Sequence, residues 1–147
     1  MRKQEPVNIL VVEDDKGHAK LIEKNLRRAS ISGEITVFHD GKAASDYIFC
    51  QAERGDRRVP SPSLVLLDLH IPIVDGYRLL ERIKSEEETK SIPVVVLTSI
   101  DDEVEVNRCY RLGCNLFITK PVDYAGFSDA IGKLGLFLTV VTLPDWE

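Results

Sequence analysis

Five short apolar runs, separated by longer stretches with helical periodicity, constrain the fold of this 147-residue chain more than any other feature. Each run is nearly unbroken, which is typical of a strand buried on both faces of a parallel sheet. The runs cover residues 7–12, 35–38, 64–67, 93–97 and 116–118, and the helical patterns cover 16–29, 42–53, a segment opening at Gly76, 102–112 and 123–138. This alternation predicts one α/β domain, a doubly wound parallel five-stranded sheet with helices on both faces.

Composition excludes several classes of function. The net charge of -5 argues against a nucleic-acid-binding face, which would need clustered Lys and Arg. No segment has the pattern of a signal peptide, and no apolar run approaches the roughly 20 residues of a membrane span. Three cysteines without a CxxC motif fit reduced thiols. We therefore expect a cytoplasmic protein that binds neither nucleic acid nor membrane.

Polar residues follow the apolar runs where parallel strands would end. Because the carboxyl ends of parallel strands lie on one edge of the sheet, these side chains should converge, and ligands of such sheets bind there. They are Glu13, Asp14 and Asp15 after the first run, Asp68 after the third, Thr98 and Ser99 after the fourth, and Thr119, Lys120 and Pro121 after the fifth.

This set of side chains indicates phosphoryl transfer. Like charges about 4 Å apart repel by roughly 4 kcal/mol at an effective dielectric constant near 20, so clustered acids lose a proton or recruit a cation. Oxygen ligands without thiolate or imidazole favour a hard ion such as Mg²⁺. A carboxylate such as Asp68, held beside a metal ion, the Lys120 ammonium and a hydroxyl, can act as the nucleophile toward a phosphoryl group.

Each of these residues also has a simpler interpretation when taken singly. Asp68 could cap the end of a strand, and Thr98 or Ser99 could cap the following helix. Lys120 alone would be an ordinary surface lysine, and Phe117 alone would be an ordinary core residue. The joint arrangement along one predicted edge is what favours a functional site.

The chain resembles the receiver domain of two-component response regulators. The segments "ILVVEDD", "LLDLHIPIVDG", "VVVLTS" and "FITKP" match that family in order and cover nearly the whole sequence. The resemblance implies a flavodoxin-like (βα)5 fold. It also implies a phosphoacceptor signalling protein rather than an enzyme, which takes a phosphoryl group from a sensor histidine kinase and signals through contacts with a downstream protein or phosphotransfer partner.

The resemblance also implies a role for each matched position. Asp68 would be the phosphoacceptor. Asp14 would bind Mg²⁺ directly, Glu13 would bind it through water, and the backbone carbonyl of His70 would complete the protein ligands. Thr98 would hydrogen-bond the phosphoryl group, Lys120 would pair with it, and Phe117 would be the aromatic residue that turns inward when Thr98 moves.

The C-terminal end departs from a minimal receiver domain. We expect residues 1–138 to form the domain and residues 139–147 to form an apolar extension, as in small stand-alone regulators paired with phytochrome-type histidine kinases. The apolar residues of 133–146 exceed what one helix needs to cover the sheet, which predicts a homodimer through this segment. The alternative is that the tail folds back over its own sheet.

Two other classes of function use parts of the same pattern. A Mg²⁺-dependent phosphohydrolase would also use Asp68 as nucleophile, but those enzymes usually carry a second acid two residues later, where this chain has His70. A flavodoxin-like cofactor binder would need a loop rich in Ser, Thr or Gly after the first strand. Three acids stand there instead, and they would repel a phosphate.

Overall fold

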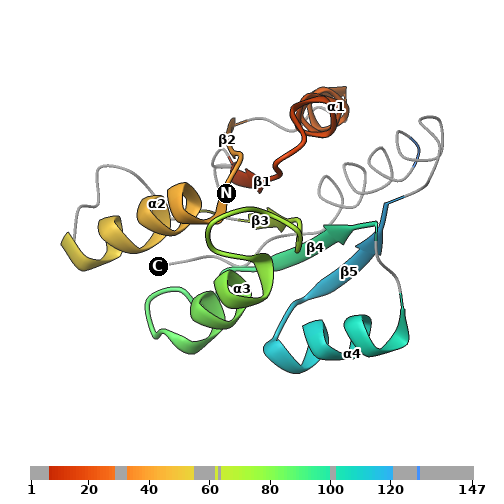
Figure 1. Ribbon diagram of the computed structural model, residues 1–147. Helices are drawn as coiled ribbons and strands as arrows, with labels where there is room; N and C mark the ends of the chain where they lie inside the picture. Colours follow the sequence, from red (N-terminus) through yellow and green to blue (C-terminus); the bar gives the residue numbers. More distant parts are fainter. Residues whose placement is uncertain are drawn as a thin grey trace, which may run out of the picture.

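A computed structural model gives the fold of the chain (Figure 1). It describes residues 7–28, 33–54, 64–99 and 102–120, together with Pro62 and Asp129. Apart from Asp129, the predicted helix over 123–138 lies outside these residues, as do most of the stretch 55–63 and the C-terminal extension 139–147. Within the described part of the chain, no helix is long and apolar enough to cross a lipid bilayer.

The described residues form alternating strands and helices, as predicted. In chain order they are β1 (Val7–Val12), α1 (Lys16–Arg28), β2 (Gly33–Phe38), α2 (Gly41–Arg54), β3 (Leu64–Leu67), α3 (Gly76–Ser85), β4 (Val94–Thr98), α4 (Glu103–Leu112) and β5 (Leu116–Thr119). The sheet order is β2-β1-β3-β4-β5, and all four strand pairings are parallel. The direction of winding reverses between β1 and β3, and ligands of such sheets bind at this reversal.

Two apolar cores, one on each face of the sheet, explain why the strands carry unbroken apolar runs. Successive residues of a strand point to opposite faces, so a strand covered on both sides must be apolar throughout. On one face, Ile22 and Leu26 of α1 pack with residues such as Leu66 of β3. On the other, α2, α3 and α4 cover residues such as Leu67 and Val96. The helices in Figure 1 follow this division, with α1 on one side of the sheet and the other three opposite.

An aspartate caps the start of each of the four described helices. Asp15 Oδ1 accepts from the backbone N–H of His18 at 3.0 Å and caps α1. Asp40 caps α2, where its Oδ1 accepts from the N–H of Ala43 at 2.7 Å, and Asp75 and Asp102 cap α3 and α4 in the same way. Glu13 and Asp68 each directly follow a strand, so their side chains stay at the edge of the sheet.

Candidate functional site

The four side chains that follow or end β1, β3, β4 and β5 meet at the carboxyl edge of the sheet, as predicted. Glu13 follows β1, Asp68 follows β3, Thr98 ends β4 and Lys120 follows β5. All four are buried, with exposed fractions of 1%, 7%, 0% and 7%. A buried group of this kind needs a partner of opposite charge or a hydrogen bond, because an isolated charge is costly in the protein interior.

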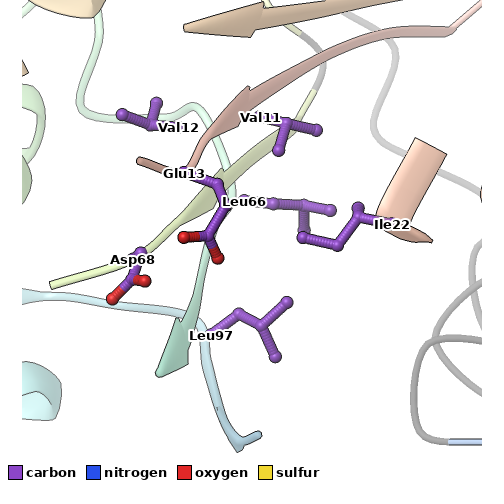
Figure 2. Close-up of a pocket in the computed structure, with 7 residues that line it drawn as sticks. All are labelled: Val11, Val12, Glu13, Ile22, Leu66, Asp68 and Leu97. Atoms are coloured by element: carbon purple, nitrogen blue, oxygen red, sulfur yellow. The ribbon is translucent and has the colours of Figure 1, made fainter. Parts of the chain in front are cut away.

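The two buried carboxylates lie next to each other. Figure 2 shows the carboxylates of Glu13 and Asp68 at the ends of their strands, with aliphatic side chains such as Leu66 and Leu97 beside them. These apolar neighbours lower the local dielectric and strengthen every electrostatic interaction beside them.

Lys120 joins the two carboxylates. Its Nζ donates to Asp68 Oδ2 at 3.0 Å and also to Glu13 Oε1. A third contact, 3.3 Å long, connects Nζ with Nδ1 of His18 in the first turn of α1. An ammonium group has three protons to donate, and two of them bind the carboxylates of Glu13 and Asp68.

The pKa values of the three charged groups move in different directions. Burial raises the pKa of Glu13 to about 7, and the nearby charge of Asp68 adds to the effect while Lys120 opposes it. Burial also acts to raise the pKa of Asp68, but the backbone N–H of His70 and the Lys120 ammonium outweigh it, so this pKa is lowered. Burial acts to lower the pKa of Lys120, yet its bonds to both carboxylates raise it. At neutral pH the site therefore favours an ionised Asp68 and a charged Lys120.

Three acids at this edge are arranged to hold a cation. Glu13, Asp14 and Asp68 each offer one carboxylate oxygen, and these oxygens lie within 4.8 Å of one another. Glu13 and Asp68 are buried and Asp14 is exposed, so the group opens to solvent on one side. Oxygen donors of this kind suit hard divalent ions, and Lys120 compensates only part of their charge. The residues present fit a divalent cation.

Thr98 carries a buried hydroxyl that is available to a ligand. Its Oγ1 has no hydrogen-bond partner among the described residues. Buried hydroxyls are nearly always paired, so an orphaned one beside an acid cluster suits an incoming anion. The backbone also links Thr98 to Lys120, whose N–H donates to the Thr98 carbonyl at 2.6 Å.

Two other predicted residues lie at the periphery. His70 is exposed, and its backbone N–H donates to Asp68 Oδ1 at 3.1 Å. The metal contact of its carbonyl stays a prediction. Phe117 is partly buried against the core under α2, α3 and α4, and its N–H donates to the hydroxyl of Tyr110 at 3.1 Å. Its inward turn also stays a prediction.

Two exposed histidines have contacts with the site. His18 contacts Lys120, and Nδ1 of His39 lies 2.9 Å from the backbone carbonyl of Glu13. The position of His18 in the turn after three acids was a usable signal for the first contact. The second depends on β2 lying beside β1, and no local pattern encodes it.

A doubly wound sheet with acids, a hydroxyl and a lysine at the carboxyl ends of its strands is the arrangement of a receiver domain. Residues 9–131 match the response regulator receiver domain family, and the chain belongs to that family. It is a phosphoacceptor signalling protein of the two-component type. This assignment favours the receiver interpretation over the phosphohydrolase and the cofactor binder.

Two of the similar proteins are described as regulators. The probable methanogenesis regulatory protein FilR2 of Methanothrix harundinacea is 40% identical over 91% of this chain and 84% of its own length. The response regulator Rcp1 of Synechocystis is 37% identical over 95% of this chain and 94% of its own length.

Solved structures agree in fold over almost the whole chain. A response regulator receiver domain from Rhodospirillum rubrum is 47% identical, with a TM-score of 0.87 over 94% of this chain and 97% of its own. The Mn²⁺-bound form of Rcp1 has a TM-score of 0.87 and 35% identity over 95% and 100% of the two chains. The phosphorylated cyanobacterial phytochrome response regulator RcpA has a TM-score of 0.86 and 32% identity over 96% and 100%.

Proposed function

We propose that Asp68 is the phosphoacceptor of this chain and that a sensor histidine kinase is its donor. The observation that carries the proposal is the Lys120 ammonium bound to the Asp68 carboxylate, beside a Thr98 hydroxyl that has no hydrogen-bond partner among the described residues. The carboxylate is the nucleophile, and the other two groups are donors placed for the phosphoryl oxygens. Both are already buried at the site, so little reorganisation is needed when the phosphoryl group arrives.

The transfer follows from the chemistry of these groups. A carboxylate oxygen of Asp68 attacks phosphorus, and a P–O bond forms as the bond from phosphorus to the donor's imidazole nitrogen breaks. The electron pair of that bond stays with the imidazole, which takes up a proton. The phosphoryl group brings a charge of roughly -1.5 to -2, which Lys120 pairs with and the Thr98 hydroxyl hydrogen-bonds.

Mg²⁺ is the cation we assign to the acidic group. Asp14 would bind it directly, Glu13 through water, and Asp68 and the backbone carbonyl of His70 would supply the other protein oxygens. When bound, the ion offsets the charge of the carboxylates and of the phosphoryl oxygens. The donor set supports this assignment, and so does the Mn²⁺-bound form of the similar Rcp1.

Phosphorylation by a small molecule tests the site without a partner protein. Acetyl phosphate with Mg²⁺ should add one phosphate to the chain, measured by intact mass spectrometry. Asp68→Asn should abolish the added mass, whereas Asp46→Asn, an exposed acid on α2, should leave it unchanged. Retention of the phosphate by the Asp68 variant would refute the assignment.

Signalling would proceed through protein contacts rather than through catalysis on a substrate. Thr98 would move toward the phosphoryl group, Phe117 would turn inward, and the face formed by α4, β5 and the following segment would shift between two populations. The likeness to the cyanobacterial phytochrome response regulator RcpA supports a phytochrome-type kinase as donor. We also expect a cytoplasmic location. The partner that receives the signal is a downstream protein or a phosphotransfer protein.

A homodimer through the C-terminal segment is the second partner we propose. Its support is the apolar surplus of residues 133–146, beyond what a helix of the domain 1–138 needs. Light scattering at micromolar concentration should give a dimer mass for the full chain and a monomer mass after removal of 139–147. A full chain that is already monomeric would refute the dimer.

A further inference from the structure

The loop between β3 and α3 contains a strained turn centred on Ile73. The φ angle of Ile73 is 75°, and no other non-glycine residue in the described part of the chain has a positive φ. The N–H of Val74 donates to the carbonyl of Pro72 at 3.0 Å, two residues back. A positive φ with this bond defines a γ-turn of the rare, strained type, above all for a β-branched residue. Glycine would adopt the same turn without strain.

The side chain of Ile73 gains no packing in return for this strain. Its exposed fraction is 74%, the highest of the large apolar residues described. Ile71, two residues earlier in the same loop, is buried in the core and only 6% exposed. The loop therefore directs one isoleucine into the protein and holds the other in solvent.

Contacts from α2 hold the turn in place. The N–H of Gly41 donates to the same Pro72 carbonyl at 3.1 Å. A Cβ atom added at Gly41 would lie 1.8 Å from the carbonyl oxygen of Val74, so the start of α2 presses directly on the turn. The strain at Ile73 is therefore built into the packing and is not an isolated irregularity of a loose loop.

The turn belongs to the loop that carries Asp68. The backbone N–H of His70 binds the Asp68 carboxylate, and the N–H of Gly76 donates to the carbonyl of Leu69 at 3.0 Å, which closes the loop at its base. A protein that transfers a phosphoryl group to Asp68 must cover this edge of the sheet. Other partners are free to bind elsewhere.

We infer that Ile73 is a docking contact for the phosphohistidine-bearing donor protein, whose surface offers an apolar pocket beside the phosphohistidine. The inference rests on the proposed phosphorylation of Asp68. It explains why a residue that is both strained and exposed occupies a position suited to glycine. The contact is made only in the complex, where burial of the side chain contributes to binding.

The test compares a small donor with protein donors. Ile73→Gly and Ile73→Asn should raise the melting temperature by about 2–4 °C, because both residues accept a positive φ. Both variants should take phosphate from acetyl phosphate at the wild-type rate. From the phosphorylated cytoplasmic domains of a panel of histidine kinases, their rate of transfer should fall about tenfold.

Two control variants isolate the apolar contact. Ile73→Val keeps a β-branched apolar side chain and should transfer within about threefold of wild type. Val104→Asn removes another exposed apolar residue, 69% exposed on α4, and should not change the rate. A fall in both the Ile73→Asn and the Val104→Asn rates would show a general surface effect and overturn the inference.

The remaining outcomes separate the docking contact from the proposed function. A wild-type chain that acetyl phosphate does not label would refute the proposed function itself. A chain labelled by acetyl phosphate but by none of the kinases would overturn both the docking contact and the kinase as donor. Equal kinase rates for wild type and the Gly and Asn variants would overturn only the docking contact. A lower melting temperature of Ile73→Gly would remove the strain on which the inference depends. A change of mass in light scattering without a change of transfer rate would overturn the inference and assign Ile73 to a contact with a second copy.

Discussion

Two lysines at opposite ends of the sheet differ in the charge of the groups that they contact. Lys120 follows β5 at the carboxyl edge and contacts the carboxylates of Glu13 and Asp68. Lys84 reaches from α3 to the other edge, where its Nζ donates to two backbone carbonyls and to the amide oxygen of Asn115 at 2.9 Å. None of these acceptors of Lys84 carries a full charge.

The difference in acceptors separates a functional lysine from a structural one. Burial lowers the pKa of Lys84, whereas the two carboxylates raise the pKa of Lys120 in spite of its burial. Asn115 Oδ1 also accepts from the N–H of Val94 at 2.8 Å, so Lys84 helps to fix the starts of β4 and β5. An ammonium held by charge can exchange one anion for another, such as a phosphoryl group. An ammonium held by neutral carbonyls, such as that of Lys84, stabilises the fold.

The largest effect is expected where the charged contacts are broken. Lys120→Met leaves Glu13 and Asp68 without their cation, and removing one partner of a buried ion pair costs about 4 kcal/mol of the free energy of unfolding. Urea denaturation in EDTA measures this loss. Because Mg²⁺ offers the acids another cation, its addition should stabilise the variant more than the wild type. An equal effect of Mg²⁺ on both proteins would show that Lys120 does not compensate the acids.

The second largest effect is a pH dependence of the free energy of unfolding, of about 3 kcal/mol, which comes from the raised pKa of Glu13. The folded chain holds this proton up to about pH 7, whereas the unfolded chain releases it near pH 4.5. Stability in EDTA should therefore fall as pH rises from about 4.5 to about 7. The lowered pKa of Asp68 acts only at more acidic pH, where its contribution to stability is lost. Glu13→Gln should flatten the profile in urea denaturation, and an unchanged slope would contradict the origin assigned here.

The smallest effect is expected at the structural lysine. Lys84→Met removes hydrogen bonds to neutral acceptors, which should lower the free energy of unfolding by about 1–2 kcal/mol. Labelling by acetyl phosphate should remain at the wild-type rate, and Mg²⁺ should stabilise the variant and the wild type equally. Loss of labelling in a folded Lys84 variant would show that the two ends of the sheet are not independent.

The fold could be predicted because its main determinant is local. Burial on both faces demands apolar strands, and all five were recognised from their composition. The first and last residues of each strand were harder to predict, because they depend on where the neighbouring strand begins and ends. β2 begins at Gly33, two residues before the prediction, because Gly33 pairs with Val7 of β1. β4 extends to Thr98, which pairs with Thr119 of β5.

The site could be predicted as far as strand ends define it. That rule brought Glu13, Asp68, Thr98 and Lys120 to one edge, where the structure has them. It gave no sign of the positive φ of Ile73. The acceptors of Lys84 come from separate parts of the chain, and the γ-turn at Ile73 depends on its contacts with the start of α2. These long-range contacts leave no periodic pattern in the sequence.

The close contact at Gly41 has a consequence for which substitutions the protein tolerates. A single methyl group at this position would collide with the Val74 carbonyl and displace the loop that carries the phosphoacceptor. In a library of all single substitutions selected for signalling, Gly41 should therefore be as intolerant as Asp68, although it takes part in no chemistry. A map of intolerant positions would therefore include the start of α2 with the site. The intolerance would arise because the turn at Ile73 leaves no space for a side chain at Gly41.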